Sequence, residues 1–333
     1  MRRRDKRRDE AEAWALLRRA PAVRLASTTA DGAPVLRTVH GVVHRCAVLL
    51  HSAVKGEKIG CLGRQAVVAA DELLGEVRSS WLDPERACPA TTLYRSAMAH
   101  GRLVERTEGK AEAMQALMER FQPQGGYRPF GDGFYEKALR GIRIIALEVE
   151  RIEAKSALGH GKPEAWRRAV AEGLWESGQL RGLRAMIDDG CWRFDGPAGV
   201  ELMPVMGPSE LAEAVTLLAP MYWNETTDED RIARAHLASP AWVGARHDGR
   251  LVATARAISD GAKLAYVMDL AVAEPWRGKG VGKAVMELLL RHPAVRACRR
   301  VELHTKTAGS FYATMDFEEA VDPAWRQTLR RSQ

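Results

Sequence analysis

The chain has 333 residues, which is more than one hydrophobic core usually organises, so we expect two domains. Hydrophobic residues make up 46% of the sequence and charged residues 28%, and no apolar run approaches the ~20 residues that cross a bilayer. Lysine plus arginine exceed aspartate plus glutamate by 50 to 43, but six of the basic residues lie among the first eight positions, as in a solvated tail. Neither a membrane nor a nucleic acid is therefore expected as a partner.

The amino terminus and the cysteines bear on location and metal content. The basic run is followed by an amphipathic stretch and by no apolar segment of the kind found in secretory signals, so we expect a cytoplasmic protein. The five cysteines are widely separated and form no Cys-x-x-Cys pair. This distribution favours neither structural disulfides nor a bound metal.

The first part of the chain has the pattern of an antiparallel β domain. Alternating apolar and polar residues predict strands over residues 22–28, 34–42, 43–51, 93–104 and 145–149. Helices are predicted over residues 9–20, 55–63 and 109–121. The Asp31-Gly32 pair between the first two strands is a hairpin signal. We place the end of this first domain at residue 157.

Residues 158–198 are predicted to be a helical connector, and residues 199–333 a second domain that mixes strands and helices. Its strands are expected over residues 201–205, 241–246, 251–259 and 263–273. Its first helices are expected over residues 209–218 and 228–237. The succession predicts an α/β domain.

A glycine-rich loop follows the last of these strands. The sequence Arg277-Gly278-Lys279-Gly280-Val281-Gly282-Lys283 lies between the apolar strand and a helical stripe that includes Val285 and Leu288. The first backbone N–H groups of a helix lack partners within the helix, and glycines let an anion approach them closely. The loop therefore predicts a site for a diphosphate, with three basic side chains to compensate its charge.

Two other phosphate-binding loops do not fit. A nucleotide P-loop requires a glycine where Arg277 stands and a serine or threonine where Ala284 stands. The dinucleotide fingerprint requires a third glycine where Lys283 stands. The remaining pattern, Arg-x-x-Gly-x-Gly at the end of a strand, resembles motif A of the GNAT acyltransferases, with Arg277, Gly280 and Gly282 in its defining positions.

The resemblance extends over about 130 residues and includes AYVMDLAVAEPWRGKGVGKAVMELLLRHP and GSFYATMDF, which is similar to the terminal helix and strand of the family. It implies an α/β fold with a mixed central sheet and acetyl-CoA as cofactor. It implies further that Leu270, Ala271 and Val272 pair with the pantetheine, and that residues 277–283 hold the pyrophosphate.

Acyl transfer to an amine needs a group that takes a proton from nitrogen and a group that donates one to the departing thiolate. In GNAT relatives a tyrosine of the last helix commonly donates, and Tyr312 matches that position, with packing beside Phe311 as the alternative role. Asp269 is the candidate base because it interrupts an apolar strand, and Asp260 is a second candidate. One departure from the family is Asp316, which stands where a glycine usually precedes Phe317.

Residues 22–153 resemble the FMN-binding split barrels of the pyridoxamine-phosphate-oxidase-like group, closest to its nitroimidazole-resistance branch. The similar segments are DGAPVLRTV, LLHSAVKGEK and CPATTLYRSAMAHGRL. The resemblance implies an antiparallel split β-barrel with helices and a homodimer that binds flavin between protomers. The residues implied to contact FMN are Arg37, Thr38 and Val39 along the ring system and His51, Ser52 and Lys58 at the phosphate.

The flavin assignment has alternatives. Glu57 stands where pyridoxamine-phosphate oxidases have a second basic residue, which argues against that particular activity, and related barrels bind haem or deazaflavin. The sequence thus predicts an acetyl-CoA-dependent N-acyltransferase of a small amine fused to a flavin-binding split barrel. An FMN-dependent oxidoreductase of small aromatic or nitro compounds and a ligand-sensing module without turnover remain as alternatives. Tyr222, Trp223 and Glu225 suggest an aromatic-lined acceptor pocket.

Overall fold

The computed structural model describes residues 7–319. The chain forms two compact units, Met1–Arg193 and Phe194–Gln333, which are described separately below. Within the described range no helix combines the length and the apolar character needed to cross a bilayer.

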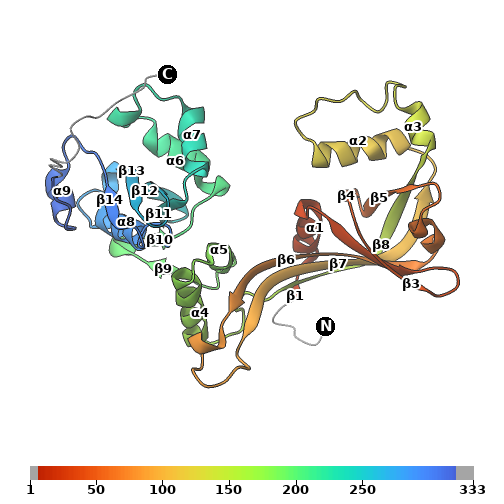
Figure 1. Ribbon diagram of the computed structural model, residues 1–333, viewed down its shortest axis with the longest axis horizontal. Coiled ribbons are helices and arrows are strands. Elements are labelled where there is room, and N and C mark those ends of the chain that lie inside the picture. Colours follow the sequence, from red (N-terminus) through yellow and green to blue (C-terminus); the bar gives the residue numbers. More distant parts are fainter. Residues whose placement is uncertain (1–6, 320–333) are drawn as a thin grey trace. The chain divides into compact units, whose positions relative to one another are not determined.

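The first unit is built on one antiparallel sheet (Figure 1). Its strands are β1 (Arg7–Arg8), β2 (Val23–Thr28), β3 (Pro34–Val39), β4 (Gly41–His44), β5 (Ala47–Ala53), β6 (Gln65–Val77), β7 (Thr91–Arg106) and β8 (Ile142–Ser156). The order is β3-β2-β6-β7-β8-β5-β4, and β1 pairs with β8. Because β3 and β4 lie at opposite edges, the barrel is split rather than closed, which confirms the predicted architecture.

Two strands differ from the sequence prediction. The strand expected over 34–42 divides at His40, because β3 pairs with β2 whereas β4 pairs with β5. Strand β6 was not predicted. It buries the small residues Ala66, Val68 and Ala70 on one face and then continues through acidic residues, a composition that does not indicate a strand.

Helix α1 (Glu10–Arg19) fills the curve of this sheet. The Asp9 carboxylate accepts the N–H of Glu12 at 2.8 Å and so caps the helix. Leu16 and Leu17 then pack into a core that includes Leu25 and Leu50. The predicted helix at 109–121 is α2 (Lys110–Phe121), the one expected at 55–63 is a short 3-10 turn, η2 (Glu57–Cys61), and α3 (Glu136–Arg140) precedes β8.

Two helices lie at the other end of β6 and β7, beyond the 3-10 turn η3 (Ser79–Trp81) (Figure 1). They are α4 (Glu164–Glu176) and α5 (Leu180–Asp188), and both lie within the predicted connector. Both helices contact β6: Leu174 of α4 packs against Gly75, and Gly182 of α5 lies so near the strand that a Cβ on it would be 3.0 Å from the Leu74 carbonyl oxygen. The limits of the predicted connector remain a prediction.

The second unit has a mixed sheet of β9 (Phe194–Asp195), β10 (Glu201–Met203), β11 (Ala241–His247), β12 (Arg250–Ser259), β13 (Leu264–Val272) and β14 (Arg300–Glu302). The order is β14-β13-β12-β11-β10-β9, with β13 and β14 parallel and the other pairs antiparallel. The mixed sheet confirms the predicted α/β class. Strand β14 was not predicted, because three residues carry too little periodicity.

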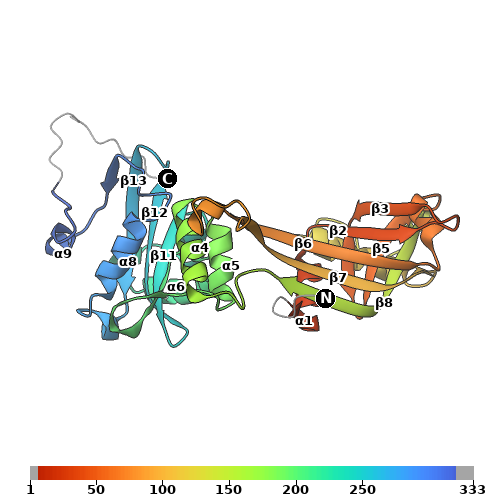
Figure 2. The ribbon, with the colours of Figure 1, turned by 90° about the horizontal axis from the view of Figure 1, so that it is seen from below.

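Helices cover both faces of this sheet. Helix α8 (Val281–Leu290) lies along β12 and β13 and buries Val285 and Leu289 in the same core as Val243 (Figure 2). Helices α6 (Leu211–Leu218) and α7 (Glu229–Leu237) pack with Ala271 instead. The last described helix is α9 (Gly309–Ala313). Residues 314–319 form no strand, and the remainder of the terminal strand expected from the resemblance lies outside the described residues.

Candidate active site and cofactor sites

Strand β13 has an open edge where the pantetheine is expected. Strand β14 pairs with β13 only from Leu264 to Tyr266. Beyond that point no other described strand pairs with this edge of β13, while the opposite edge continues on β12 to Val272 with a register shift. Asp269 lies at this irregularity with φ 54°, a left-handed conformation that is rare for a residue other than glycine. The backbone of residues 270–272 is thus placed beside a gap in the sheet.

The glycine loop presents its amides beside this gap. Gly278 and Gly280 have φ 71° and 80°, conformations that glycine adopts without strain. No acceptor among the described residues bonds the backbone N–H groups of residues 278–283, whereas the N–H of Ala284 already bonds the Gly280 carbonyl at 3.0 Å. The start of α8 therefore has a row of free donors and the positive end of the helix dipole, the arrangement that binds an anionic group.

The side chains around the loop have different roles. Arg277 donates through Nε to the Val272 carbonyl at 3.0 Å, which ties the loop to the end of β13. Gly282 faces the strand closely, since a Cβ there would be 3.3 Å from Val272 Cγ2. Lys279 lies over the Trp276 ring before the helix start, whereas the Lys283 ammonium is 3.9 Å from Glu287, one turn further along α8; both side chains are exposed.

A cavity of about 260 Å³ adjoins the open edge of β13. It brings together Tyr312 from α9, Asp269 and Leu270 from β13, and Tyr222 and Trp223 from the segment before α7. The suggested aromatic lining is thus present, although Glu225 is not part of it. Burial raises the pKa of Tyr312, so its hydroxyl keeps its proton at neutral pH.

The ring of Tyr312 also packs. It lies in edge contact with Phe311, at 5.0 Å between ring centroids, and with Phe317, at 5.9 Å. These contacts fix the ring, and Tyr312 is also part of the cavity wall. Asp316, the departure from the family pattern, has φ 62°, so aspartate adopts the conformation that favours glycine at this turn.

Both carboxylate oxygens of Asp269 accept hydrogen bonds. Trp223 donates through Nε1 to Oδ1 at 2.9 Å, and Arg256 donates through Nε to Oδ2 at 2.5 Å. The buried His236 lies with Nε2 3.9 Å from the same Oδ2. The second candidate base, Asp260, is not in the cavity wall; it accepts the N–H groups of residues 262–264, which lower its pKa and shape the turn before β13.

The sequence did not single out two residues of this cavity, Tyr266 and His304. The Tyr266 hydroxyl and His304 Nδ1 are hydrogen-bonded to each other, and both side chains line the cavity. His304 follows the unpredicted strand β14, so no local pattern indicated it. Tyr266 lies in an apolar strand, where nothing in the sequence distinguishes it from a packing residue.

The six residues expected to contact FMN lie at one end of the first unit, on β3, β5 and η2. Ser52 is buried under Gly56, where a Cβ would be only 2.5 Å from the serine Oγ. Lys58 donates through Nζ to the His51 carbonyl at 2.8 Å, and burial lowers the pKa of both side chains, with Lys58 adding to the effect on His51. Thr38 and Val39 lie beside Arg37 on the edge strand β3.

Glu57 forms an ion pair with one of these residues. Its Oε2 is 2.5 Å from Nη2 of Arg37, and both side chains are about half exposed. The carboxylate therefore neutralises a guanidinium that the resemblance assigns to the flavin. The side-chain donors Arg37, Ser52 and Lys58 suit the anionic phosphate of a flavin, whereas the carboxylate of Glu57 would repel it.

An open-edged mixed sheet with an amide-rich helix start is the arrangement expected of an acyltransferase domain, and the split sheet is the one expected of the oxidase-like barrels. Family models agree with both. Residues 209–317 match the acetyltransferase (GNAT) family, and residues 9–156 match pyridoxamine 5'-phosphate oxidase. The chain thus joins a pyridoxamine 5'-phosphate oxidase-like domain to a GNAT acetyltransferase domain, and the latter makes it an acyltransferase enzyme.

Solved structures similar to parts of the chain include proteins of both kinds. A putative GNAT acetyltransferase from Xanthomonas campestris pv. campestris is 28% identical, with a TM-score of 0.37 over 41% of this chain and 96% of its own. A putative 5-nitroimidazole antibiotic resistance protein from Bacteroides thetaiotaomicron is 19% identical, with a TM-score of 0.36 over 44% of this chain and 83% of its own. The FAD and heme binding protein from Mycobacterium smegmatis is 21% identical, with a TM-score of 0.41 over 51% and 81%. Among curated proteins no match was found.

Proposed function

We propose that the chain is an acetyl-CoA-dependent N-acyltransferase of a small amine. The observation that supports this most directly is the row of unbonded N–H groups over residues 278–283, next to the open edge of β13. The amides suit the pyrophosphate, and the backbone of Leu270, Ala271 and Val272 suits the pantetheine amides. An acyl group continued along that edge reaches the cavity of Tyr312 and Asp269.

Two residues of the cavity are proposed for the two proton transfers, Asp269 as acceptor and Tyr312 as donor. An alkylammonium has a pKa of about 10.4 and must lose a proton before its nitrogen attacks the thioester. Asp269 is the proposed acceptor; each of its oxygens accepts one hydrogen bond and keeps a further lone pair for the amine proton. Tyr312, protonated because burial raises its pKa, is the proposed donor to the thiolate.

The function is tested by thiol release from acetyl-CoA across a panel of small amines, with mass spectrometry of the product. Acetylated amine formed in step with free coenzyme A supports the proposal. A protein that binds acetyl-CoA and releases no thiol with any amine would instead be a sensing module. Native mass spectrometry of the same preparation reports retained cofactors and the proposed homodimer.

Replacing Asp269 with asparagine should lower kcat/KM at pH 7 by at least about tenfold, because the variant cannot accept the amine proton. The defect should shrink as the pH approaches the amine's own pKa of about 10.4, since an amine already neutral needs no base. Parallel pH profiles of the two proteins check this. A defect that is the same at every pH would assign Asp269 to holding Trp223 and Arg256 only.

For the first domain we propose FMN as the ligand of Arg37, Thr38, Val39, His51, Ser52 and Lys58. The basic and hydroxyl groups there suit a phosphate, and an oxidoreductase acting on small aromatic or nitro compounds is the second candidate function. A colourless protein that takes up no FMN would exclude that redox activity and leave the acyltransferase intact.

Replacing Glu57 with glutamine should tighten FMN binding several-fold, because it removes a negative charge next to Lys58, a proposed ligand of the phosphate. Riboflavin is the control, since it has the ring system without the phosphate. Fluorescence titration of both ligands measures the effect. Equal changes for FMN and riboflavin would place Glu57 away from the phosphate.

A further inference from the structure

A second cavity, of about 660 Å³, lies in the first unit and has no part in either site described above. We name it the indole cavity; the residues that line it include Trp81, Ser156, His160, Lys162, Trp166 and Ala169. Its lining comes from η3, the start of β7, the end of β8 and α4, whereas the residues proposed for FMN lie on β3, β5 and η2 at the other end of the first unit (Figure 1). Its volume lies within the range of about 300–1,000 Å³ typical of small-molecule sites.

Two indole rings form this cavity, and glycines fix both. Trp81 lies on the backbone of α4 at Gly173, where a Cβ would be 2.2 Å from Cδ2 of the ring. Trp166 lies against Gly159, which has φ 104° and where a Cβ would be 3.0 Å from Cζ3 of that ring. Neither glycine accommodates another residue without displacing a tryptophan, so the positions of the rings depend on both glycines.

The two indoles lie at separate points along α4. Trp166 and Gly173 are seven residues apart on α4, which corresponds to about 10 Å along the helix axis. Ala169 lies between them and contributes only a methyl group to the wall. A planar molecule stacked between two rings needs about 7 Å, twice the ordinary carbon contact distance.

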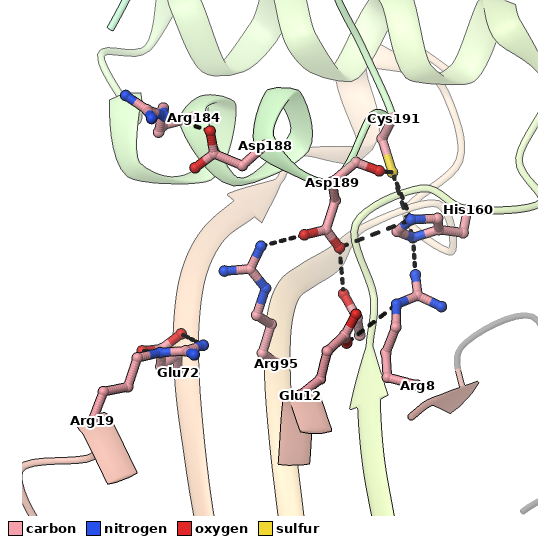
Figure 3. Close-up of polar contacts among 11 residues, drawn as sticks. Arg8, Glu12, Arg19, Glu72, Arg95, His160, Arg184, Asp188, Asp189 and Cys191 are labelled. Atoms are coloured by element: carbon pink, nitrogen blue, oxygen red, sulfur yellow. Dashed lines mark hydrogen bonds and ion pairs between the residues drawn. The ribbon is translucent and has the colours of Figure 1, made fainter. Parts of the chain in front are cut away.

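The inner wall of the cavity is polar and held rigidly. Ser156, only 2% exposed, donates through Oγ to Oδ2 of Asp189 at 3.3 Å. His160 Nε2 lies 3.8 Å from the same oxygen (Figure 3). Arg95 binds the other oxygen of Asp189, and Arg8 is hydrogen-bonded to the His160 ring (Figure 3). This network connects β1, β7 and β8 to the end of α5 and keeps the wall in place.

The lining of the cavity contains one lysine and one carboxylate. The Lys162 ammonium is 5.3 Å from the centroid of the Trp166 ring, and in the described part of the chain no carboxylate forms an ion pair with it. The one acidic lining residue, Asp83, already accepts the N–H groups of Glu85 and Arg86 at 3.0 Å each. A ligand that stacks beside Trp166 therefore meets an unneutralised cation.

We propose that the indole cavity binds a flat aromatic acid of one or two rings. The ring lies between Trp81 and Trp166 over Ala169, and its carboxylate pairs with Lys162. Aromatic stacking against both indoles supplies the affinity, and the ammonium selects for the anion.

The test is calorimetry on the full chain with 2-naphthoate, compared with naphthalene-2-methanol, which lacks the charge, and cyclohexanecarboxylate, which lacks the aromatic ring. Naphthoate should bind several-fold more tightly than the alcohol, and cyclohexanecarboxylate should give no measurable heat. Absence of naphthoate binding at millimolar concentration, or equal binding of all three compounds, would overturn the proposal.

Two variants test whether naphthoate binds in the indole cavity. Ala169→Leu fills the space between the indoles and should weaken naphthoate at least about tenfold, whereas Ala138→Leu, the same change at an exposed position of α3, should not. Lys162→Met at the exposed rim should abolish the preference for naphthoate over the alcohol. Matching near-ultraviolet circular dichroism verifies that the variants are folded. Naphthoate binding that neither cavity variant changes would place the ligand elsewhere and refute the site.

Discussion

Replacing Gly280 with aspartate should abolish measurable acetyl-CoA binding. The new carboxylate would lie at the start of α8, beside the free amides of residues 278–283, and would meet the cofactor's pyrophosphate at close range. Two unit charges about 4 Å apart repel by roughly 4 kcal/mol at the effective dielectric constant of a protein surface, which corresponds to a loss of about 1,000-fold. Calorimetry with acetyl-CoA measures the effect.

Gly280→Asn is the matched control. Asparagine has nearly the same shape as aspartate, and both residues tolerate the left-handed conformation better than other side chains do. A Cβ at this position has room, since its nearest neighbour is the Pro197 Cβ at 3.6 Å. We expect the asparagine variant to bind within about tenfold of the unchanged protein, and we expect added salt to narrow the gap between the two variants. If both variants lose acetyl-CoA affinity equally, the loss comes from the added side chain's bulk, and the result would contradict a phosphate bound beside residue 280.

The glycine loop could be predicted from the sequence because its determinants are contiguous. Seven neighbouring residues, Arg277 to Lys283, contain the glycines, the charges and the helix start, so the spacing alone excluded two other phosphate loops. The open edge of β13, in contrast, could not be predicted from the sequence and is seen only in the structure. That edge exists because β14 stops pairing at Tyr266, three residues before Asp269.

The cavity beside β13, in contrast to the glycine loop, could not be predicted from contiguous residues. Tyr222, Tyr266, His304 and Tyr312 come from four segments of the second unit that only the fold brings together. The resemblance to GNAT relatives indicated Tyr312, through its place in the last helix, and gave no reason to connect it with His304. The ion pair of Arg37 with Glu57 is similar: the sequence marked the glutamate as a departure, but its partner on β3 lies 20 positions earlier.

Strand β6 shows why the first domain was only partly predicted. Period-2 alternation indicates a strand when the buried residues are large and the exposed ones polar. The buried face of β6 begins with the small residues Ala66, Val68 and Ala70, and the strand forms because β2 and β7 pair with both of its edges. That pairing is a property of the whole sheet. The hairpin at Asp31-Gly32, in contrast, depends on local turn chemistry and was predicted correctly.

Replacing Tyr312 with phenylalanine should lower kcat by about 100-fold and leave the affinity for acetyl-CoA nearly unchanged. Phenylalanine keeps the ring and therefore the contacts with Phe311 and Phe317, so that only the hydroxyl is lost. General-acid catalysis contributes about 100- to 10,000-fold, and an interaction made only in the transition state lowers kcat without weakening substrate binding. Steady-state kinetics and calorimetry on the same preparation separate the two quantities.

The hydroxyl of Tyr222 provides the control, because it belongs to the same cavity and Tyr222→Phe removes an equal group. If Tyr312 is the proton donor, only its own variant should show the large loss of kcat. Burial raises the pKa of the Tyr312 hydroxyl above its ordinary value near 10, so deprotonation of this residue should not reduce the turnover of the unchanged protein below about pH 10. A turnover that survives Tyr312→Phe would leave this tyrosine with packing alone, and the thiolate would then take its proton from water or from the Tyr266–His304 pair.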